Sequence, residues 1–167
     1  MTSLAFARRY SMAHRFLSDA APKCMTPHGH DEIVTVRVQA TSPISFGGDN
    51  MAAPFDAVKG RWKRWIDEHV DHAFQLNGAD PLIAWFRAHE PARLASVMTF
   101  EGDPTTEALA AAFWRKLDAF LRHDDLPFCV QEVRIDETPT NAVILGAAPD
   151  RAPAPWASRA DWSINDF

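Results

Sequence analysis

Residues 24–40, CMTPHGHDEIVTVRVQA, predict both a central strand and a cluster of metal ligands. The β-branched residues in the second half of this stretch indicate a strand over His28–Ala40. Side chains alternate along a strand, so His28 and His30 are expected to project to the same face. Gly29 lets the backbone bend close to whatever the imidazoles hold. The alternative interpretation is a pair of solvated histidines at a turn.

A third histidine, His14, ends a shorter run over Leu4–His14 that also alternates as a strand does. If the two strands are neighbours, His14 brings a third nitrogen to the same point. Three neutral imidazoles with an open fourth position are the ligand set of a catalytic zinc, as opposed to a closed structural site. Cys24, close before His28, adds a potential nucleophile or base and favours the functional interpretation.

The composition is that of an ordinary globular protein. The chain has 167 residues, of which 47% are hydrophobic and 23% charged, and one domain is expected. The net charge of −5, without a basic cluster, gives no reason to propose nucleic-acid binding. We see neither a transmembrane run nor a signal peptide, so a cytoplasmic location without membrane contact is expected, with both cysteines reduced.

Helical spacing marks three further segments. Pro54 opens an apolar stripe that extends to Val70, and a short helix is expected over Pro81–His89. A long amphipathic helix follows Asp103, which is the expected N-cap. The stretch 71–80 is expected to be a loop.

Two more alternating runs, 129–135 and 142–147, predict strands near the C-terminus. The order strand, strand, helix, helix, strand, strand indicates an α+β fold with an antiparallel sheet. We expect the fold to occupy residues 1–148. Residues 149–167, rich in proline and alanine and containing two tryptophans, are expected to be a C-terminal tail that packs late or on a neighbouring subunit.

Several short motifs occur in a fixed order along the chain. They are Ala13-His14-Arg15, Cys24-x-x-x-His28-Gly29-His30, Asp71-His72 with Leu76-Asn77, Pro104-Thr105-Thr106-Glu107, and Glu137-Thr138. This series, from about residue 6 to 145, resembles the 6-pyruvoyl-tetrahydropterin synthase / 6-carboxy-tetrahydropterin synthase family. The resemblance implies a tunnelling fold (T-fold), with a four-stranded antiparallel sheet and two helices on one face. Subunits of that family join into a barrel, as a trimer or hexamer, with pockets between them.

Within the family, the spacing of Cys24 and His28 and the pair Lys23-Cys24 are similar to the bacterial 6-carboxy-tetrahydropterin synthases of queuosine biosynthesis. The resemblance implies a zinc-dependent lyase that converts 7,8-dihydroneopterin triphosphate to 6-carboxytetrahydropterin, acetaldehyde and triphosphate. The alternatives are a 6-pyruvoyl-tetrahydropterin synthase and a non-catalytic paralogue that binds zinc and a pterin. A generic cupin-like metal binder would need more strands and fewer helices.

The resemblance also implies roles for single residues. Zn²⁺ would be held by the three histidines named above, and the Cys24 thiolate would act as general base. Asp71 and His72 would form a proton relay. The alternative for Cys24 is a small buried residue that only packs in the core. The alternative for Asp71 and His72 is that the aspartate caps a helix end and the histidine is a cation near the helix C-terminus.

Substrate contacts are implied for four residues. Glu137 would accept two N–H bonds from the amino-pyrimidine edge of the pterin, as a catalytic and binding residue. Thr105 and Thr106 would add pterin contacts, and Lys23 would bind the triphosphate. The alternatives are a surface acid at a strand end, helix-capping threonines and solvated surface charge.

The chain departs from the family pattern in a few places. Glu32 stands where an aromatic residue is usual, and it shares strand parity with the histidine pair. It could be a fourth ligand, a second base or a salt-bridge partner, and a fourth ligand would close the open position. The interval 78–103 is also longer than in compact bacterial members.

Overall fold

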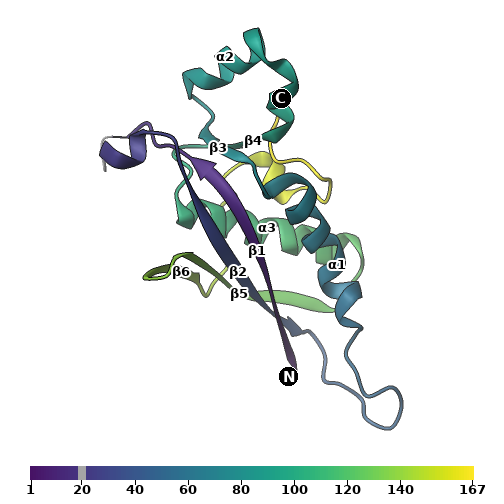
Figure 1. The fold of residues 1–167 in the computed structure, drawn as a ribbon. Helices are drawn as coiled ribbons and strands as arrows, with labels where there is room; N and C mark the ends of the chain where they lie inside the picture. Colours follow the sequence, from purple (N-terminus) through teal and green to yellow (C-terminus); the bar gives the residue numbers. More distant parts are fainter. Residues whose placement is uncertain (19–21) are drawn as a thin grey trace.

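The computed structural model describes residues 1–18 and 22–167, and its centre is one mixed sheet (Figure 1). In the described ranges six strands follow the spatial order β4-β3-β1-β2-β5-β6. Their bounds are Ser3–His14 (β1), His28–Ala40 (β2), Phe74–Asn77 (β3), Val97–Phe100 (β4), Phe128–Thr138 (β5) and Asn141–Leu145 (β6). Strands β1, β2, β5 and β6 pair antiparallel, whereas β3 and β4 run parallel to β1.

The prediction of a four-stranded antiparallel sheet is therefore correct for β1, β2, β5 and β6 but incomplete. Strand β3 lies within the stretch 71–80, for which a loop was the wrong prediction. Both β3 and β4 have four residues, and all four residues of β4 are buried. Such a short strand, covered on both faces, shows no alternation that a sequence pattern could reveal.

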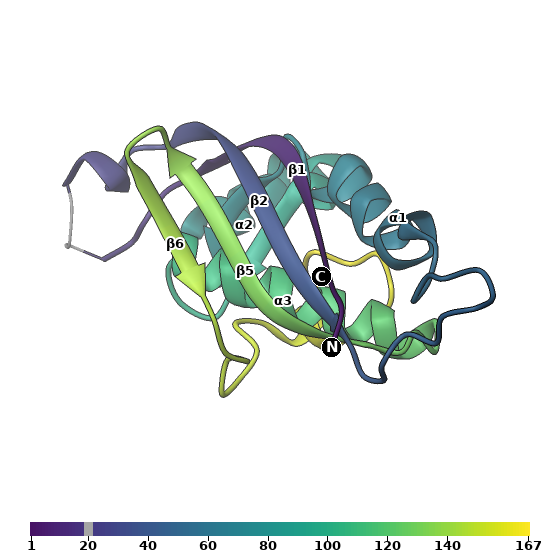
Figure 2. The same ribbon diagram turned by 90° about the horizontal axis from the view of Figure 1, so that it is seen from below.

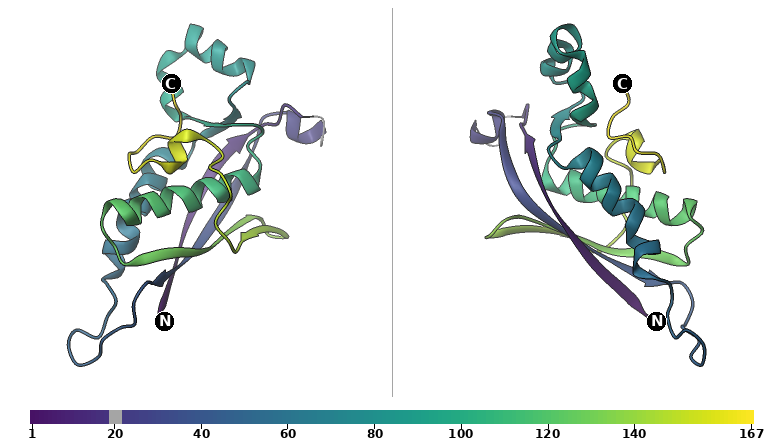
Figure 3. Two further views of the ribbon diagram at one scale, coloured as in Figure 1. Left: turned by 180° about the vertical axis from the view of Figure 1, so that it is seen from behind. Right: turned by 45° about the vertical axis from the view of Figure 1, so that its right-hand side comes forward.

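The described residues form three α-helices, Phe55–Trp65 (α1), Pro81–His89 (α2) and Thr106–His123 (α3). Two of them, α1 and α3, cover one face of the sheet, which Figure 2 shows from the strand side and Figure 3 from two further directions. The third, α2, packs through Ile83 against Leu76 of β3 and Val97 of β4 in a separate hydrophobic cluster. A π-helical segment, Ile66–Val70, continues α1 and completes the predicted apolar stripe. The expected bounds of α2 are confirmed. None of the helices in the described residues is both long and apolar enough to span a bilayer.

The N-cap of α3 is Thr105, and the prediction of Asp103 is wrong. The Thr105 hydroxyl accepts a hydrogen bond from the Ala108 amide at 3.3 Å. The Asp103 carboxylate is directed away from the helix, toward backbone amides of the segment after β1.

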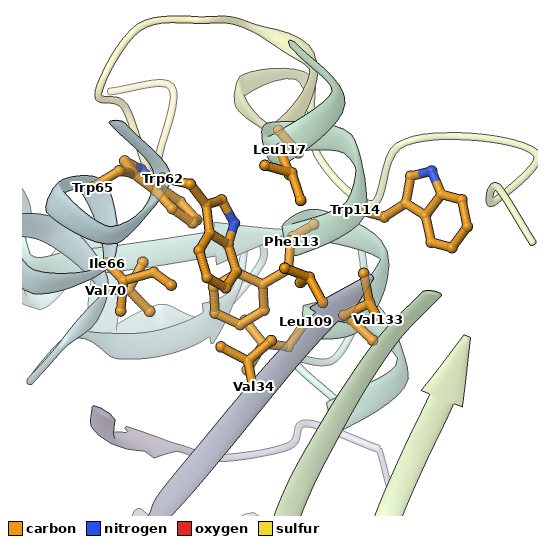
Figure 4. Packing of buried hydrophobic residues seen from close by; sticks show 14 of the residues in the cluster. Val34, Trp62, Trp65, Ile66, Val70, Leu109, Phe113, Trp114, Leu117 and Val133 are labelled. Atoms are coloured by element: carbon orange, nitrogen blue, oxygen red, sulfur yellow. The ribbon is translucent and has the colours of Figure 1, made fainter. Parts of the chain in front are cut away.

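The core lies between the sheet and helices α1 and α3 (Figure 4). Phe113 of α3 packs edge-on against Trp62 and Trp65 of α1, with ring centroids 5.8 and 5.7 Å apart. Val34 of β2 and Val133 of β5 cover the same cluster from the sheet and are fully buried. The tryptophans of α1 are thus core residues, as the helical spacing predicts.

The C-terminal segment, which was expected to pack late or on a neighbouring subunit, returns to this core of its own chain. Trp156 is fully buried, its ring centroid lies 6.2 Å from that of Trp65 at a tilt of 35°, and it donates its indole N–H to the Thr99 carbonyl at 2.7 Å. The buried Lys116 of α3 donates to three carbonyls of the segment, those of Trp156, Arg159 and Asp161. Residues 149–167 therefore complete the core of their own chain.

Candidate functional site

The pairing of β1 with β2 brings the three predicted metal ligands together. His14, the last residue of β1, lies opposite His28, the first residue of β2, and His30 follows on the same face. One ring nitrogen of each histidine lies within 4.8 Å of the corresponding atoms of the other two. The three imidazoles therefore converge on one point, as strand parity predicts.

The outer nitrogens of two rings are held by backbone carbonyls. His14 Nδ1 is 3.0 Å from the Pro104 carbonyl, and His28 Nδ1 is 2.9 Å from the Thr26 carbonyl. Because a carbonyl only accepts, each Nδ1 carries the proton and each Nε2 presents a lone pair. This arrangement orients imidazoles in metal sites.

The inner nitrogens of these rings fit a cation. The Nε2 atoms of His14 and His28 are 3.0 Å apart, a separation at which two lone pairs repel unless a positive charge lies between them. Burial lowers the pKa of His14 to about 4, so this imidazole is neutral at neutral pH and an added proton does not supply the positive charge. A divalent metal ion suits this donor set, and three imidazoles match an open zinc site.

A cavity of about 470 Å³ adjoins the three histidines. Cys24, half-buried, lines it from a turn of 3₁₀ helix over Pro22–Met25. Thr105 and Thr106 line it from the start of α3, and Glu137 lines it from the end of β5. The structure thus places these four predicted residues around one cavity that the histidines share.

Glu137 is oriented by Thr106, whose hydroxyl donates to Glu137 Oε1 at 2.5 Å. Thr106 is buried and Glu137 half-buried, so this hydrogen bond is shielded from water. Thr105 also lines the cavity, although its hydroxyl caps α3. Within this chain, Thr106 therefore supports the carboxylate that is predicted to bind the pterin.

The Asp71–His72 pair forms but does not line the cavity of its own chain. Asp71 Oδ1 accepts the Ser11 amide at 2.8 Å, and Asp71 Oδ2 is 3.0 Å from His72 Nδ1. The His72 side chain is 81% exposed, on a residue with φ of 66°. Lys23 is likewise exposed, next to Cys24 but outside the set of residues that line the cavity.

Glu32 forms a buried hydrogen bond with Tyr10 that the sequence did not reveal. The register places Tyr10 of β1 opposite Glu32, and the Tyr10 hydroxyl donates to Glu32 Oε2 at 2.5 Å. Glu32 Oε1 is buried and has no protein hydrogen-bond partner among the described residues. Burial raises the pKa of Glu32 to about 7 against the effect of the Tyr10 hydrogen bond, and the charge of Glu137 adds to the rise. Glu32 is not part of the converging ligand group, which consists of the three histidines.

A sheet with two helices on one face, and three converging histidines that could hold a metal ion near a cysteine, define an α+β protein with a candidate metal site. Comparison with known proteins makes this specific. The family model described as 6-pyruvoyl tetrahydropterin synthase matches residues 3–147, and the chain belongs to that family.

Relatives of known name agree with this membership. The chain is 32% identical over 139 residues to a protein of Halobacterium salinarum named "Probable 6-carboxy-5,6,7,8-tetrahydropterin synthase", covering 83% of this chain and 81% of the relative. It is 24% identical over 132 residues to the 6-carboxy-5,6,7,8-tetrahydropterin synthase of Rickettsia conorii, covering 78% and 89%.

Solved structures confirm the predicted tunnelling fold. An uncharacterized protein from Wolinella succinogenes superposes with a TM-score of 0.70 at 21% identity, over 87% of this chain and 97% of that one. The 6-pyruvoyl tetrahydropterin synthase of Caenorhabditis elegans superposes with a TM-score of 0.59 at 21% identity, over 88% and 96%.

Proposed function

We propose that this protein is a zinc-dependent lyase of the 6-carboxy-5,6,7,8-tetrahydropterin synthase type. It would convert 7,8-dihydroneopterin triphosphate and water to 6-carboxytetrahydropterin, acetaldehyde and triphosphate. The observation that carries the proposal is the convergence of three imidazoles on a cavity that Cys24 and Glu137 also line. The names of the Halobacterium salinarum and Rickettsia conorii relatives support the choice of reaction.

His14, His28 and His30 would hold the zinc ion. Zinc bound there supplies Lewis acidity that makes the side-chain hydroxyls of the substrate more acidic. The Pro104 and Thr26 carbonyls keep two of the imidazoles in the tautomer that donates its Nε2 lone pair inward. The chain itself therefore fixes the protonation state that metal binding needs.

Cys24 would move the proton at the substrate side chain. Its turn is tied to the end of β1 because the Phe16 amide donates to the Cys24 carbonyl at 2.8 Å. The thiol thereby faces the same cavity as the histidines. A thiolate held there can remove a proton from a side-chain carbon and return it later in the reaction.

Glu137 would bind and orient the pterin. Two carboxylate oxygens can accept the two parallel N–H donors of an amino-pyrimidine edge, and such charge-assisted pairs are strong when water is excluded. Thr106 fixes the rotation of the carboxylate through its hydroxyl. The pterin side chain would then extend toward Cys24 and the histidines.

The Asp71–His72 pair would reach a cavity of a neighbouring subunit. Its exposed imidazole and its position outside its own cavity are what a residue presented across a subunit boundary requires. Asp71 orients the imidazole, so that His72 can exchange a proton with the substrate. Lys23 would meet the triphosphate on the exposed side of the Cys24 turn. A homo-oligomer, trimer or hexamer, is part of this proposal.

Product analysis tests the reaction. The zinc-loaded protein is incubated with 7,8-dihydroneopterin triphosphate, products are resolved by mass, and acetaldehyde is trapped. We expect 6-carboxytetrahydropterin and acetaldehyde in equal amounts. A pyruvoyl product without acetaldehyde would show a 6-pyruvoyl-tetrahydropterin synthase instead, and no turnover with zinc bound would contradict both enzymes.

The two free cysteines provide a matched pair of variants. Cys24→Ala removes the proposed base and is expected to lower kcat by about a hundredfold or more, the usual contribution of general base catalysis. Cys129→Ala removes a half-buried thiol on β5 and should keep kcat within about twofold. Equal activity of the two variants would contradict the role of Cys24.

A further inference from the structure

The short segment Asp103–Thr106, between β4 and α3, touches several walls of the cavity. The Pro104 carbonyl holds His14 Nδ1 at 3.0 Å, and the Thr106 hydroxyl holds Glu137 at 2.5 Å. Thr105 caps α3 and thereby fixes the segment on a long, buried helix. The remaining residue, Asp103, contacts neither the metal ligands nor Glu137, and it is not the helix cap.

The Asp103 carboxylate accepts hydrogen bonds from three N–H groups. Oδ1 accepts the Leu17 amide at 2.9 Å and the Asn77 side-chain amide at 3.0 Å, and Oδ2 accepts the Ser18 amide at 2.9 Å. Against the opposing effect of burial, the bonds from Ser18, Leu17 and Asn77 lower the pKa of Asp103 to about 2. Charge-assisted bonds of this kind are stronger than neutral ones.

Two of the residues that Asp103 binds are next in sequence to a contact of Cys24. Leu17 and Ser18 directly follow Phe16, whose amide donates to the Cys24 carbonyl at 2.8 Å. Both Leu17 and Ser18 are exposed, so little packing holds them in place. Asp103 therefore supplies a polar attachment at the point where the chain leaves β1 toward the Cys24 turn.

We propose that Asp103 is a positioning residue that clamps Leu17 and Ser18 and thereby sets the place of the Cys24 thiol relative to the three histidines. The segment Asp103–Thr106 then fixes a metal ligand, the thiol and the pterin-binding carboxylate from one short piece of backbone. The chemical role of Cys24 rests on the proposed function, whereas the clamp itself does not.

The test replaces Asp103 by asparagine in a Cys129→Ala background, so that Cys24 is the one remaining thiol. Asparagine has the same shape but a single acceptor oxygen, so it cannot serve the donors on both sides of the carboxylate. Amide hydrogen exchange of Leu17 and Ser18 is measured by NMR, and alkylation of Cys24 by iodoacetamide is followed in the zinc-loaded protein. Neither measurement needs a substrate.

We expect exchange at one or both of these amides to be about tenfold faster, because a charge-assisted hydrogen bond is lost. The rate of Cys24 alkylation should change at least about threefold, while exchange of the core amides of Val34 and Val36 stays the same. If the protein turns over its substrate, kcat should fall with KM nearly unchanged, because Glu137 still binds the pterin. The control Asp49→Asn changes an exposed loop carboxylate and should alter none of these quantities.

Unchanged exchange at Leu17 and Ser18, together with an unchanged Cys24 alkylation rate, would overturn the proposal. If Asp103→Asn also accelerates exchange in the core, Ser18→Pro decides the question, because it removes the Ser18 N–H from an exposed residue and leaves Asp103 in place. Faster Leu17 exchange and altered Cys24 alkylation in Ser18→Pro support the clamp, and unchanged values overturn it. Absence of turnover in every form would contradict the proposed function and leave these results standing.

Discussion

Glu32→Gln should stabilise the metal-free protein at alkaline pH and change little at acidic pH. Glu32 is fully buried, and burial raises its pKa from 4.5 to about 7. A carboxyl whose pKa is raised by folding binds its proton more tightly in the native state, so its ionisation destabilises that state. The destabilisation is absent below pH 4.5, grows between pH 4.5 and 7, and is complete above pH 7.

The size of the effect follows from the same two values. A rise from 4.5 to about 7 corresponds to roughly 3 kcal/mol of unfolding free energy. Glutamine cannot ionise, keeps an acceptor for the Tyr10 hydroxyl, and places an amide where Oε1 lacks a protein partner among the described residues. We expect the variant to be more stable by less than about 1 kcal/mol at pH 5 and by about 3 kcal/mol at pH 8.

The assay is urea unfolding of the wild type and the variant between pH 5 and pH 8, after removal of metal by a chelator. Metal-free protein is used because a cation at the three histidines would favour the ionised carboxylate. Glu101→Gln, at an exposed turn, is the matched control and should give a difference that does not depend on pH. A Glu32→Gln variant that is less stable than wild type at pH 8, or a stability difference that does not vary with pH, would show that burial of Glu32 does not raise its pKa in the native state.

Three further outcomes are expected. Gly29→Ala would place its Cβ 2.5 Å from the Met12 carbonyl of β1, so the two strands must separate and zinc content, measured by mass spectrometry, should fall well below one ion per chain. Trp156→Ala should lower the unfolding free energy by about 3 to 5 kcal/mol in urea, because it empties a fully buried site in the core. An equal mixture of inactive Cys24→Ala and His72→Ala proteins, unfolded and refolded together, should regain activity if neighbouring subunits share a site. Failure to regain activity would place His72 outside the shared cavity.

The local signals of the sequence predicted the long elements well. Alternation gave the bounds of β2, and Pro81 marked the start of α2. Strand β4 could not be predicted because its four residues are all buried and show no alternation. The start of α3 was misplaced because Asp103 and Thr105 are both good N-caps, and the contacts of Asp103 with a distant segment decide between them.

The metal ligands could be predicted because strand parity and one antiparallel pairing suffice to bring them together. The hydrogen-bond partner of Glu32 could not be predicted, because the pairing of Tyr10 with Glu32 depends on the register of β1 and β2, which no short motif encodes. The exposed place of His72 could not be predicted from its motif either, because the motif gives its neighbours in sequence and not the surface it faces. Burial of the C-terminal segment could not be predicted either, because it depends on contacts with α3 that are distant in sequence, such as the hydrogen bond from Lys116 to the Trp156 carbonyl.

The most direct test of the central claim is X-ray absorption spectroscopy at the zinc edge on the zinc-loaded protein. We expect one zinc per chain with three imidazole nitrogens at about 2.0–2.1 Å and a single further oxygen ligand that substrate can displace. A sulfur ligand supplied by Cys24, with a Zn–S distance of about 2.3 Å, would contradict the proposed role of this thiol, because a bound thiolate could not act as a base. A zinc content that stays the same when His14, His28 or His30 is replaced would contradict the three-histidine site equally.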